Sequence, residues 1–307
     1  MEYVLRTFDL SKRYKKQLAV NCANMNIGRG DIYGFVGENG SGKTTIIRLI
    51  TGLIFPHSGS FELFGIPNHD ARIHEARRKV GAIVESPSIY QNMSASDNLR
   101  MQCTILGLKD EGLVAEVLDE VGLGELYTEK KHVSNFSLGM RQRLGIAMAL
   151  LGKPEFLLLD EPMNGLDPAG IVEIRELILR LNREKGITFL ISSHILTELA
   201  LVATKYGIIS KGKIIREITS SELHAQCGKN TLIKVDHPDR LAALLKELIP
   251  EQYIRYIPEG VMITGEVNLN ALLGRIINAG IRILSVNCTE SSFEDYYLSL
   301  IGGGKNV

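Results

Sequence analysis

Residues 37–44 carry the pattern G-x-x-x-x-G-K-[ST], a loop that can bind the phosphates of a nucleoside triphosphate. Its glycines let the backbone turn so that successive N–H groups point at anionic oxygens. Lys43 can then reach the β- and γ-phosphates, and the hydroxyl of Thr44 can bind Mg²⁺. The residues predicted to bind phosphate are Gly37, Glu38, Asn39, Gly40, Ser41, Gly42, Lys43, Thr44 and Thr45.

Two adjacent carboxylates, Asp160 and Glu161, follow the apolar residues 156–159. Phosphoryl transfer to water needs a metal ion on the phosphate oxygens and a group that orients or deprotonates water. Asp160 suits the first task, and Glu161 suits the second. Adjacent carboxylates are more often solvated surface residues, but a buried strand before them and a phosphate loop upstream favour the catalytic interpretation.

These motifs need strands and helices that hold them at one edge of a sheet. Residues 32–36 are predicted to form a buried strand, and residues 45–50 a helix with an apolar side, which is the context that the phosphate loop requires. The start of that helix adds its positive end to the site. Residues 156–159 form a continuous apolar run, as expected for a parallel strand covered on both faces. Further strands are predicted at residues 80–84, 189–191 and 206–209.

Other segments are predicted to flank this α/β sheet. Residues 3–8, 18–27 and 61–64 have strand character and are expected to form a small sheet beside the nucleotide.

Between residues 94 and 151 the pattern is helical instead, with a start at Ser94 and a stop at Gly107. Asp167, followed by proline, predicts another helix start.

A change of pattern near residues 220–230 divides the chain into two predicted domains, residues 1–222 and residues 229–302. The second reads strand, helix, strand, strand, helix, strand, a β-α-β-β-α-β order that predicts a small α+β, ferredoxin-like domain. Its predicted elements are residues 231–235, 238–249, 252–257, 260–264, 268–278 and 281–287, followed by a last helix. The glycine-rich residues 302–307 are expected to be disordered.

The composition limits the classes of function. Lys plus Arg and Asp plus Glu are equal at 35 each, so a broad basic face for nucleic acid is not indicated. No run of about 18 uncharged apolar residues predicts a membrane span, and the N-terminus lacks the pattern of a secretion signal. The four cysteines have no paired spacing, which favours reduced thiols in the cytosol. We expect a cytoplasmic protein without a membrane span or a nucleic-acid partner.

The motifs, in this order and at this spacing, resemble those of ATP-binding cassette (ABC) ATPases over about residues 2–225. The resemblance implies a P-loop NTPase cassette: a RecA-like α/β core, a small antiparallel β subdomain and a helical subdomain. Residues 136–140, Phe-Ser-Leu-Gly-Met, resemble the family's signature, whose common form is Leu-Ser-Gly-Gly-Gln. Without the resemblance, this stretch would be an ordinary helix capped by Ser137. With it, Ser137 and Gly139 are expected to contact the γ-phosphate of ATP held by the opposite subunit.

Three more residues receive roles from this resemblance alone. His194 matches the switch histidine that contacts the γ-phosphate, and Asp167 ends the loop that crosses between subunits. Tyr14 matches the aromatic residue that stacks on adenine. With Lys43 and Glu161, His194 completes the predicted catalytic set.

Glu85 departs from the family pattern, which usually has glutamine at this place between the two lobes. We expect Glu85 to lie near the nucleotide and the metal, so that Thr44, Asp160 and Glu85 are the predicted metal ligands. A glutamate here resembles the ABC ATPases of bacitracin-export and lantibiotic-immunity systems, as does the C-terminal segment. Such systems carry their membrane subunits on separate chains.

The resemblance implies an ATPase that uses ATP and Mg²⁺ and closes as a nucleotide-sandwiched homodimer. It implies separate transmembrane permease subunits, with this chain attached to the inner face of the cell membrane and driving the export of antimicrobial peptides or antibiotics. The alternative is a soluble ABC-type ATPase that acts as a regulatory or ribosome-associated switch. A single cassette without a long coiled-coil insert argues against the ribosomal role, and Asp160, Glu161 and His194 argue against a switch that does not hydrolyse ATP.

Overall fold

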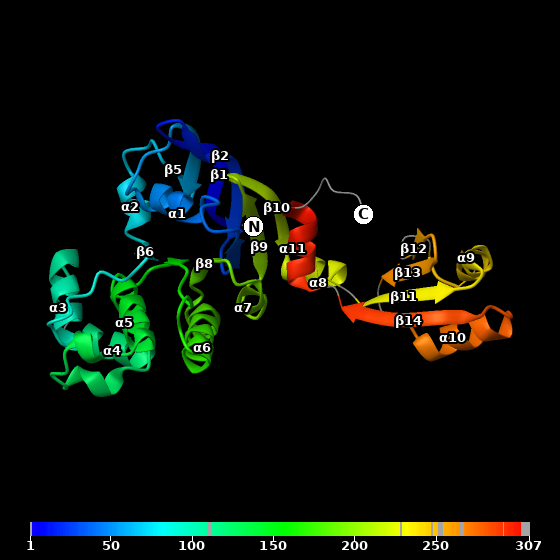
Figure 1. The fold of residues 1–307 in the computed structure, drawn as a ribbon. Coiled ribbons are helices and arrows are strands. Elements are labelled where there is room, and N and C mark those ends of the chain that lie inside the picture. Colours follow the sequence, from blue (N-terminus) through cyan, green and yellow to red (C-terminus); the bar gives the residue numbers. More distant parts are fainter. Residues whose placement is uncertain are drawn as a thin grey trace. The chain divides into compact units, whose positions relative to one another are not determined.

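The computed structural model describes residues 2–109, 112–227, 229–246, 248–250, 254–264, 267–290 and 292–301. Contacts divide the chain into two compact units, Met1–Thr219 and Ser220–Val307. Each unit has its own sheets and its own core (Figure 1).

The centre of the first unit is a six-stranded sheet with the strand order β10-β9-β3-β8-β7-β6. All neighbouring strands in it are parallel except β10, which pairs antiparallel with β9 at one edge. The middle strands are apolar runs buried along their whole length, which is why they appear as unbroken hydrophobic stretches in the sequence. The strands are β3 (Ile32–Val36), β6 (Val80–Ile83), β7 (Phe156–Asp160), β8 (Thr188–Ser193), β9 (Lys205–Ser210) and β10 (Lys213–Thr219).

A second sheet in the first unit has the order β2-β1-β4-β5 and is antiparallel. Its strands are β1 (Tyr3–Tyr14), β2 (Gln17–Gly28), β4 (Ser58–Leu63) and β5 (Ile66–Pro67). The sequence predicted β1 to end at residue 8. The strand runs on to Tyr14 because its polar second half pairs with β2 in a hairpin, through register shifts that apolar alternation cannot reveal.

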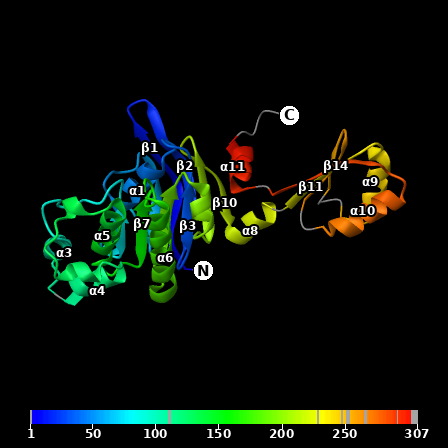
Figure 2. The ribbon, with the colours of Figure 1, turned by 60° about the horizontal axis from the view of Figure 1, so that its bottom comes forward.

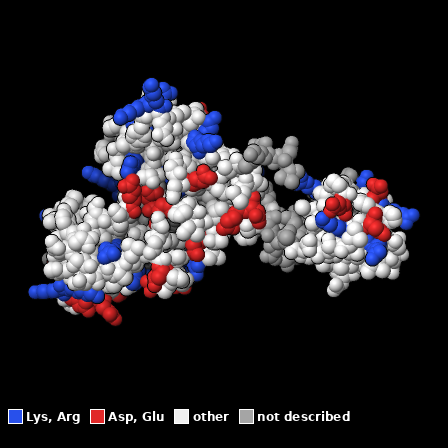
Figure 3. Space-filling view, in the orientation of Figure 1, with Lys and Arg blue, Asp and Glu red and all other residues white. Residues whose placement is uncertain are grey.

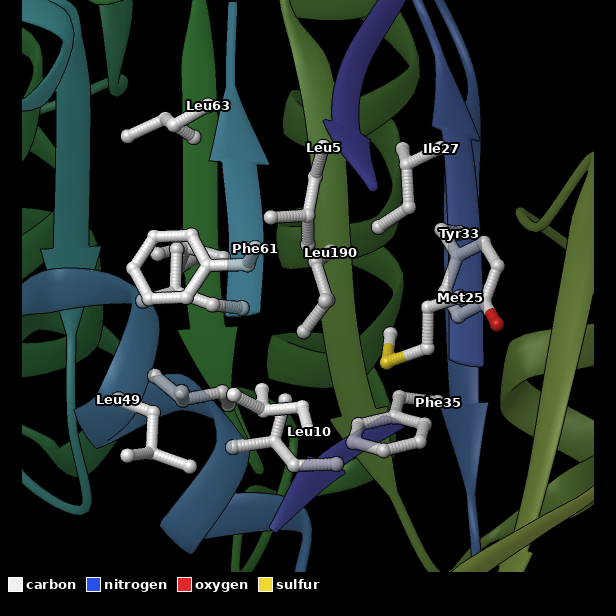
Figure 4. Packing of buried hydrophobic residues seen from close by; sticks show 14 of the residues in the cluster. Leu5, Leu10, Met25, Ile27, Tyr33, Phe35, Leu49, Phe61, Leu63 and Leu190 are labelled. Carbon is white, nitrogen blue, oxygen red and sulfur yellow. The ribbon is translucent and has the colours of Figure 1, made fainter. Parts of the chain in front are cut away.

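The core of the first unit fills the space between the two sheets (Figure 4). Leu5 and Phe61 approach it from the antiparallel sheet, Phe35 and Leu190 from the parallel one. Helix α1 (Lys43–Thr51), which begins at the phosphate loop, adds Leu49. Because this core holds α1 against both sheets, the phosphate loop sits on a rigid base.

The helices confirm the predicted starts and stops. The side chain of Ser94 accepts a hydrogen bond from the N–H of Asp97 at the start of α3, and Gly107 ends the helix with φ of 69°. Asp167 caps α6 in the same manner. Figures 1 and 2 show α3, α4 and α5 gathered as a group of helices apart from β1 and β2. The helices are α2 (Ile73–Arg77), α3 (Ala95–Leu106), α4 (Gly112–Glu120), α5 (Leu138–Leu150), α6 (Pro168–Lys185) and α7 (Leu196–Ala200), with 3-10 turns at Gly124–Tyr127 and Val133–Asn135.

On the face seen in Figure 3, Lys and Arg side chains gather at the top of the first unit, whereas Asp and Glu side chains form patches across its middle.

The second unit has the predicted order of elements. Its strands form one antiparallel sheet with the order β12-β13-β11-β14. Helices α9 and α10 contribute Leu241, Leu245, Leu272 and Ile276 to the core on this sheet. Helix α9 is described to Lys246; residue 247 of the predicted helix 238–249 and the predicted disorder of residues 302–307 lie outside the described residues. The elements are α8 (Ser220–Gln226), β11 (Lys229–Val235), α9 (Pro238–Lys246), β12 (Ile254–Ile257), β13 (Gly260–Thr264), α10 (Leu269–Asn278), β14 (Ile283–Glu290) and α11 (Phe293–Ile301).

Candidate active site

The structure brings four predicted segments to one edge of the parallel sheet. Residues 37–42 follow β3, Glu85 follows β6, Asp160 and Glu161 end β7, and His194 follows β8. These four strands are neighbours, and their carboxyl ends meet at the same edge. That edge is the usual ligand site of an open α/β sheet.

The phosphate loop has the tight backbone that its glycines predict. Gly42 has φ of 114°, and a Cβ atom on it would lie 2.6 Å from the carbonyl oxygen of Ala19. A Cβ on Gly37 would lie 2.6 Å from the Oγ of Ser41. That hydroxyl is buried and has no hydrogen-bond partner within the described part of the chain. Buried polar atoms in native proteins are nearly always satisfied, so an anion in this loop would complete the site.

Lys43 is 5% exposed, and its ammonium group lies over the same loop. Its Nζ donates to the carbonyl oxygens of Gly37 at 2.5 Å and Glu38 at 3.2 Å. It also lies 3.3 Å from Oε1 of Glu161. A charge buried in this way needs partners, and the loop carbonyls and Glu161 supply them.

Two of the three predicted metal ligands, Thr44 and Asp160, are in contact with each other. The hydroxyl of Thr44 donates to Oδ2 of Asp160 at 2.7 Å, and the hydroxyl of Ser192 donates to Oδ1 at 2.5 Å. Mg²⁺ prefers oxygen ligands and usually takes only one or two carboxylates from the protein, with phosphates and water as the others. The described residues contain no group of three or more His, Cys, Asp or Glu side chains that could hold a metal alone. One hydroxyl and one carboxylate therefore fit magnesium bound together with a nucleotide.

Glu161 is held in a specific orientation. Its backbone has φ of 51°, and its N–H donates to the Oγ of Ser192 at 2.9 Å. Its carboxylate lies 2.7 Å from Nδ1 of His194 and, on the other oxygen, 3.3 Å from Lys43. The left-handed backbone is uncommon for glutamate and typical of functional sites. It directs the carboxylate toward the phosphate loop, where it can orient water.

Ser192 was not among the residues predicted from the sequence. Its hydroxyl binds both the carboxylate of Asp160 and the backbone N–H of Glu161, so one buried side chain connects these two predicted site residues. The available signal was its position at the end of the apolar run 189–191, two residues before His194.

A family model described as "ABC transporter" matches residues 20–164. The bacitracin transport ATP-binding protein BcrA of Bacillus licheniformis is 41% identical over 306 residues, which cover 99% of each chain. The chain belongs to the ABC transporter family.

Two other ABC proteins are similar over about seven tenths of this chain. The lantibiotic transport ATP-binding protein SrtF of Streptococcus pyogenes is 45% identical over 216 residues, 70% of this chain and 90% of its own. The structure of cbiO1 from Clostridium perfringens, part of the ABC transporter complex cbiONQ, aligns with a TM-score of 0.65 at 27% identity. That alignment covers 73% of this chain and 91% of cbiO1. The first unit is thus an ABC ATPase cassette, a P-loop NTPase that binds and hydrolyses ATP.

Other predicted residues of this ABC cassette lie outside the cluster around Asp160. Ser137 is the exposed N-cap of α5, where its Oγ accepts from the N–H of Met140 at 3.1 Å. Asp167 caps α6 by accepting from Gly170 at 3.1 Å, and a Cβ on Gly139 would lie 3.9 Å from Leu166. Among the described contacts, no hydrogen bond or ion pair links Ser137 or Asp167 to the phosphate loop. Within one chain, the signature therefore contacts the loop before α6 and leaves its exposed cap available to another molecule.

Tyr14 and Glu85 occupy two further positions of the cassette. The ring of Tyr14 is 43% exposed at the end of the β1–β2 hairpin, so one face can stack on a base. Glu85, predicted to bind the metal, has φ of 65°, and its carboxylate binds the guanidinium of Arg48 at 2.5 Å. Its role toward the metal stays a prediction.

Proposed function

We propose that this chain is the ATP-hydrolysing motor of an exporter that confers resistance to peptide antibiotics of the bacitracin or lantibiotic type. The observation that carries this proposal is the similarity to the bacitracin transport protein BcrA over 99% of both chains, which includes the second unit. The described residues contain no helix long and apolar enough to cross a membrane. Separate permease subunits would therefore supply the membrane path, with this chain bound to them at the inner face of the cell membrane.

The residues of the site define how it would act on ATP. The N–H groups of the phosphate loop and the ammonium of Lys43 bind the β- and γ-phosphates, and Thr44 and Asp160 would hold magnesium. Magnesium would neutralise charge on the phosphate oxygens. Glu161 orients the attacking water and accepts its proton. His194, 2.7 Å from Glu161, holds that carboxylate in place and can reach the γ-phosphate.

One chain supplies only part of the complete site. Among the described contacts, no hydrogen bond or ion pair joins Ser137 or Asp167 to the phosphate loop of the same chain. A second copy arranged head to tail would place Ser137 and Gly139 on the first copy's γ-phosphate and Asp167 at the boundary between the subunits, so each ATP would be held between two chains.

This arrangement predicts that a bulky charge at Ser137 blocks dimerisation. Ser137→Arg, made in the Glu161→Gln background, is expected to raise the protein concentration for half-maximal ATP-dependent dimerisation at least about tenfold, roughly 1.4 kcal/mol. ATP affinity of the monomer should not change. Sizing chromatography with light scattering measures the dimer, and Ser134→Arg is a matched control at a nearby exposed serine. Normal dimerisation of the Ser137 variant would contradict the composite site.

A groove between the parallel sheet and the group of helices is our candidate permease site. Its volume is about 960 Å³, and it is lined by apolar residues of α3 and α5 together with residues 86–88. Leu53 and Ile105 at the groove are each 65% exposed. Among its described lining residues, two are charged, Arg77 and Arg78, and both are basic. We propose that a cytoplasmic helix of the permease binds here by apolar contacts and presents an acidic side chain to these arginines.

Glu85 lies beside this groove and is proposed to connect ATP hydrolysis with transport. Glu85→Gln is expected to leave hydrolysis by the isolated protein within about tenfold of the parent rate, roughly 1.4 kcal/mol in barrier. The reason is that Glu85 follows β6 and precedes the segment lining the groove, while Glu161 has its carboxylate held between Lys43 and His194. Steady-state phosphate release checks the rate, and resistance of cells checks coupling. A loss of hydrolysis as deep as that of Glu161→Gln would make Glu85 catalytic instead.

The second unit is proposed to be an accessory domain, residues 229–302, that supports the dimer. It has its own apolar core, and the similarity to BcrA covers 99% of this chain whereas the match to SrtF covers 70% of this chain and 90% of SrtF. Its presence is therefore a feature of one group of these transport proteins.

The cargo is tested in cells. Deleting the gene should lower the inhibitory concentration of bacitracin, of a lantibiotic or of both, and the parent gene should restore it. The Glu161→Gln gene should not restore it, because an assembled but inactive motor cannot drive export. Unchanged susceptibility to both classes of compound after deletion would refute the proposed cargo.

A further inference from the structure

An ion pair joins the helix of the phosphate loop to the segment that leaves β6. Arg48 lies on α1 four residues after Thr44, about one helical turn. Its Nη2 is 2.5 Å from Oε1 of Glu85, with the two side chains 36% and 63% exposed. Glu85 is therefore bound to the same helix that carries Thr44.

The connecting arm, residues 86–93, begins directly after Glu85. It is bound to α3 at Tyr90. Asn98 of α3 is 1% exposed and binds both backbone groups of Tyr90. Its Oδ1 accepts from the N–H of Tyr90 at 2.8 Å, and its Nδ2 donates to the carbonyl oxygen at 3.1 Å. The arm is thus held at Glu85 to α1 and at Tyr90 to α3.

The connecting arm also binds the backbone that precedes the signature. The carbonyl oxygen of Met93 accepts from the N–H of Val133 at 3.0 Å, and that of Gln91 accepts from Ser134 at 3.0 Å. Ser137 follows three residues later. A displacement of the arm would therefore reach the N-terminus of α5 through two backbone hydrogen bonds.

We propose that Arg48 is a positioning residue that acts through Glu85. The ion pair holds the connecting arm, and with it residues 133–135 before the signature, in register with the phosphate-loop helix. A glutamate here carries a charge that glutamine lacks, and Arg48 compensates it next to a site for anionic phosphates. This inference rests on the proposed function. There, the signature of each chain contacts the ATP bound by the partner chain, and the ion pair would position that signature.

Hydrogen exchange of the nucleotide-free full-length chain tests this directly. Arg48→Gln and Glu85→Gln each remove one charge and keep a long polar side chain. In either variant, amides in residues 86–93 and 133–135 should exchange about two- to fivefold faster. This factor corresponds to the stabilisation that an exposed ion pair typically contributes. The double variant should exchange no faster than the single ones. The reversed pair, Arg48→Glu with Glu85→Arg, should return to the parent rates.

Controls separate positioning from general loosening. Arg72→Gln removes the ion pair between Arg72, at the start of α2, and Asp70, which lie 2.8 Å apart. It should leave amide exchange in the connecting arm at the parent rates. Peptides from β7 and β11 should keep parent rates in every variant. Unchanged exchange in either single variant, failure of the reversed pair, or faster exchange in β7 would each overturn the proposal. ATP hydrolysis by the parent chain is measured separately, so a failure here is distinguishable from a failure of the proposed function.

Discussion

Replacing Glu161 by glutamine is expected to lower ATP hydrolysis by about 10²- to 10⁴-fold, the range of a lost general base. Glutamine fills the same space, and its amide oxygen and nitrogen can still meet Lys43 and His194. It cannot accept a proton from water, because its amide is not basic. Binding of ATP should persist, since the phosphate loop, Thr44 and Asp160 are unchanged. The chain should then remain in an ATP-bound dimer.

Phosphate release over time measures the rate, and sizing chromatography with ATP measures the dimer. Glu155→Gln is the matched control, because Glu155 is a paired carboxylate at the opposite end of the same strand. It lies 2.9 Å from Lys79 and 2.6 Å from Arg29. That variant should hydrolyse ATP at the parent rate. If Glu161→Gln also turns over at the parent rate, the base is another residue.

The phosphate loop and the carboxylate pair could be predicted because each depends on a short stretch of chain. A glycine loop between a strand and a helix, or two acids after a buried strand, is visible locally. Ser192 and Arg48 are different. Each contacts a residue distant in sequence, Asp160 for Ser192 and Glu85 for Arg48. The residues next to a serine or an arginine do not indicate such a contact.

The same distinction explains the fold. Element order in the second unit follows from apolar periodicity, so the helix at Leu269–Asn278 lies close to its prediction. The length of β1 does not, because its last residues are polar and become strand through pairing with β2. Tertiary pairing can override local preference in this way. The end of β1 could therefore not be predicted from the sequence, because pairing with β2 determines it.

Replacing Lys43 by alanine is expected to weaken ATP binding by about 10- to 100-fold, the equivalent of roughly 1.5–3 kcal/mol for hydrogen bonds to a charged group. Lys43 is 5% exposed, and the loop holds its ammonium group where the β- and γ-phosphates would lie. Without it, phosphate charge in the loop would be balanced by backbone N–H groups and magnesium alone. Glu161 would also lose the cation 3.3 Å from its carboxylate, so the residual hydrolysis should fall further than binding does.

Titration with a fluorescent ATP analogue measures the affinity, and thermal unfolding shows whether the variant is folded. Lys205→Ala is the matched control: its Nζ is part-buried, donates to the carbonyl oxygen of Asn26 at 2.6 Å and lies 3.6 Å from Glu217. If loss of any part-buried lysine weakened nucleotide binding by destabilising the fold, both variants would bind the ATP analogue weakly. A specific role requires that Lys43→Ala alone loses affinity while both variants unfold cooperatively. Parent-like affinity in Lys43→Ala would show that the phosphates are held elsewhere.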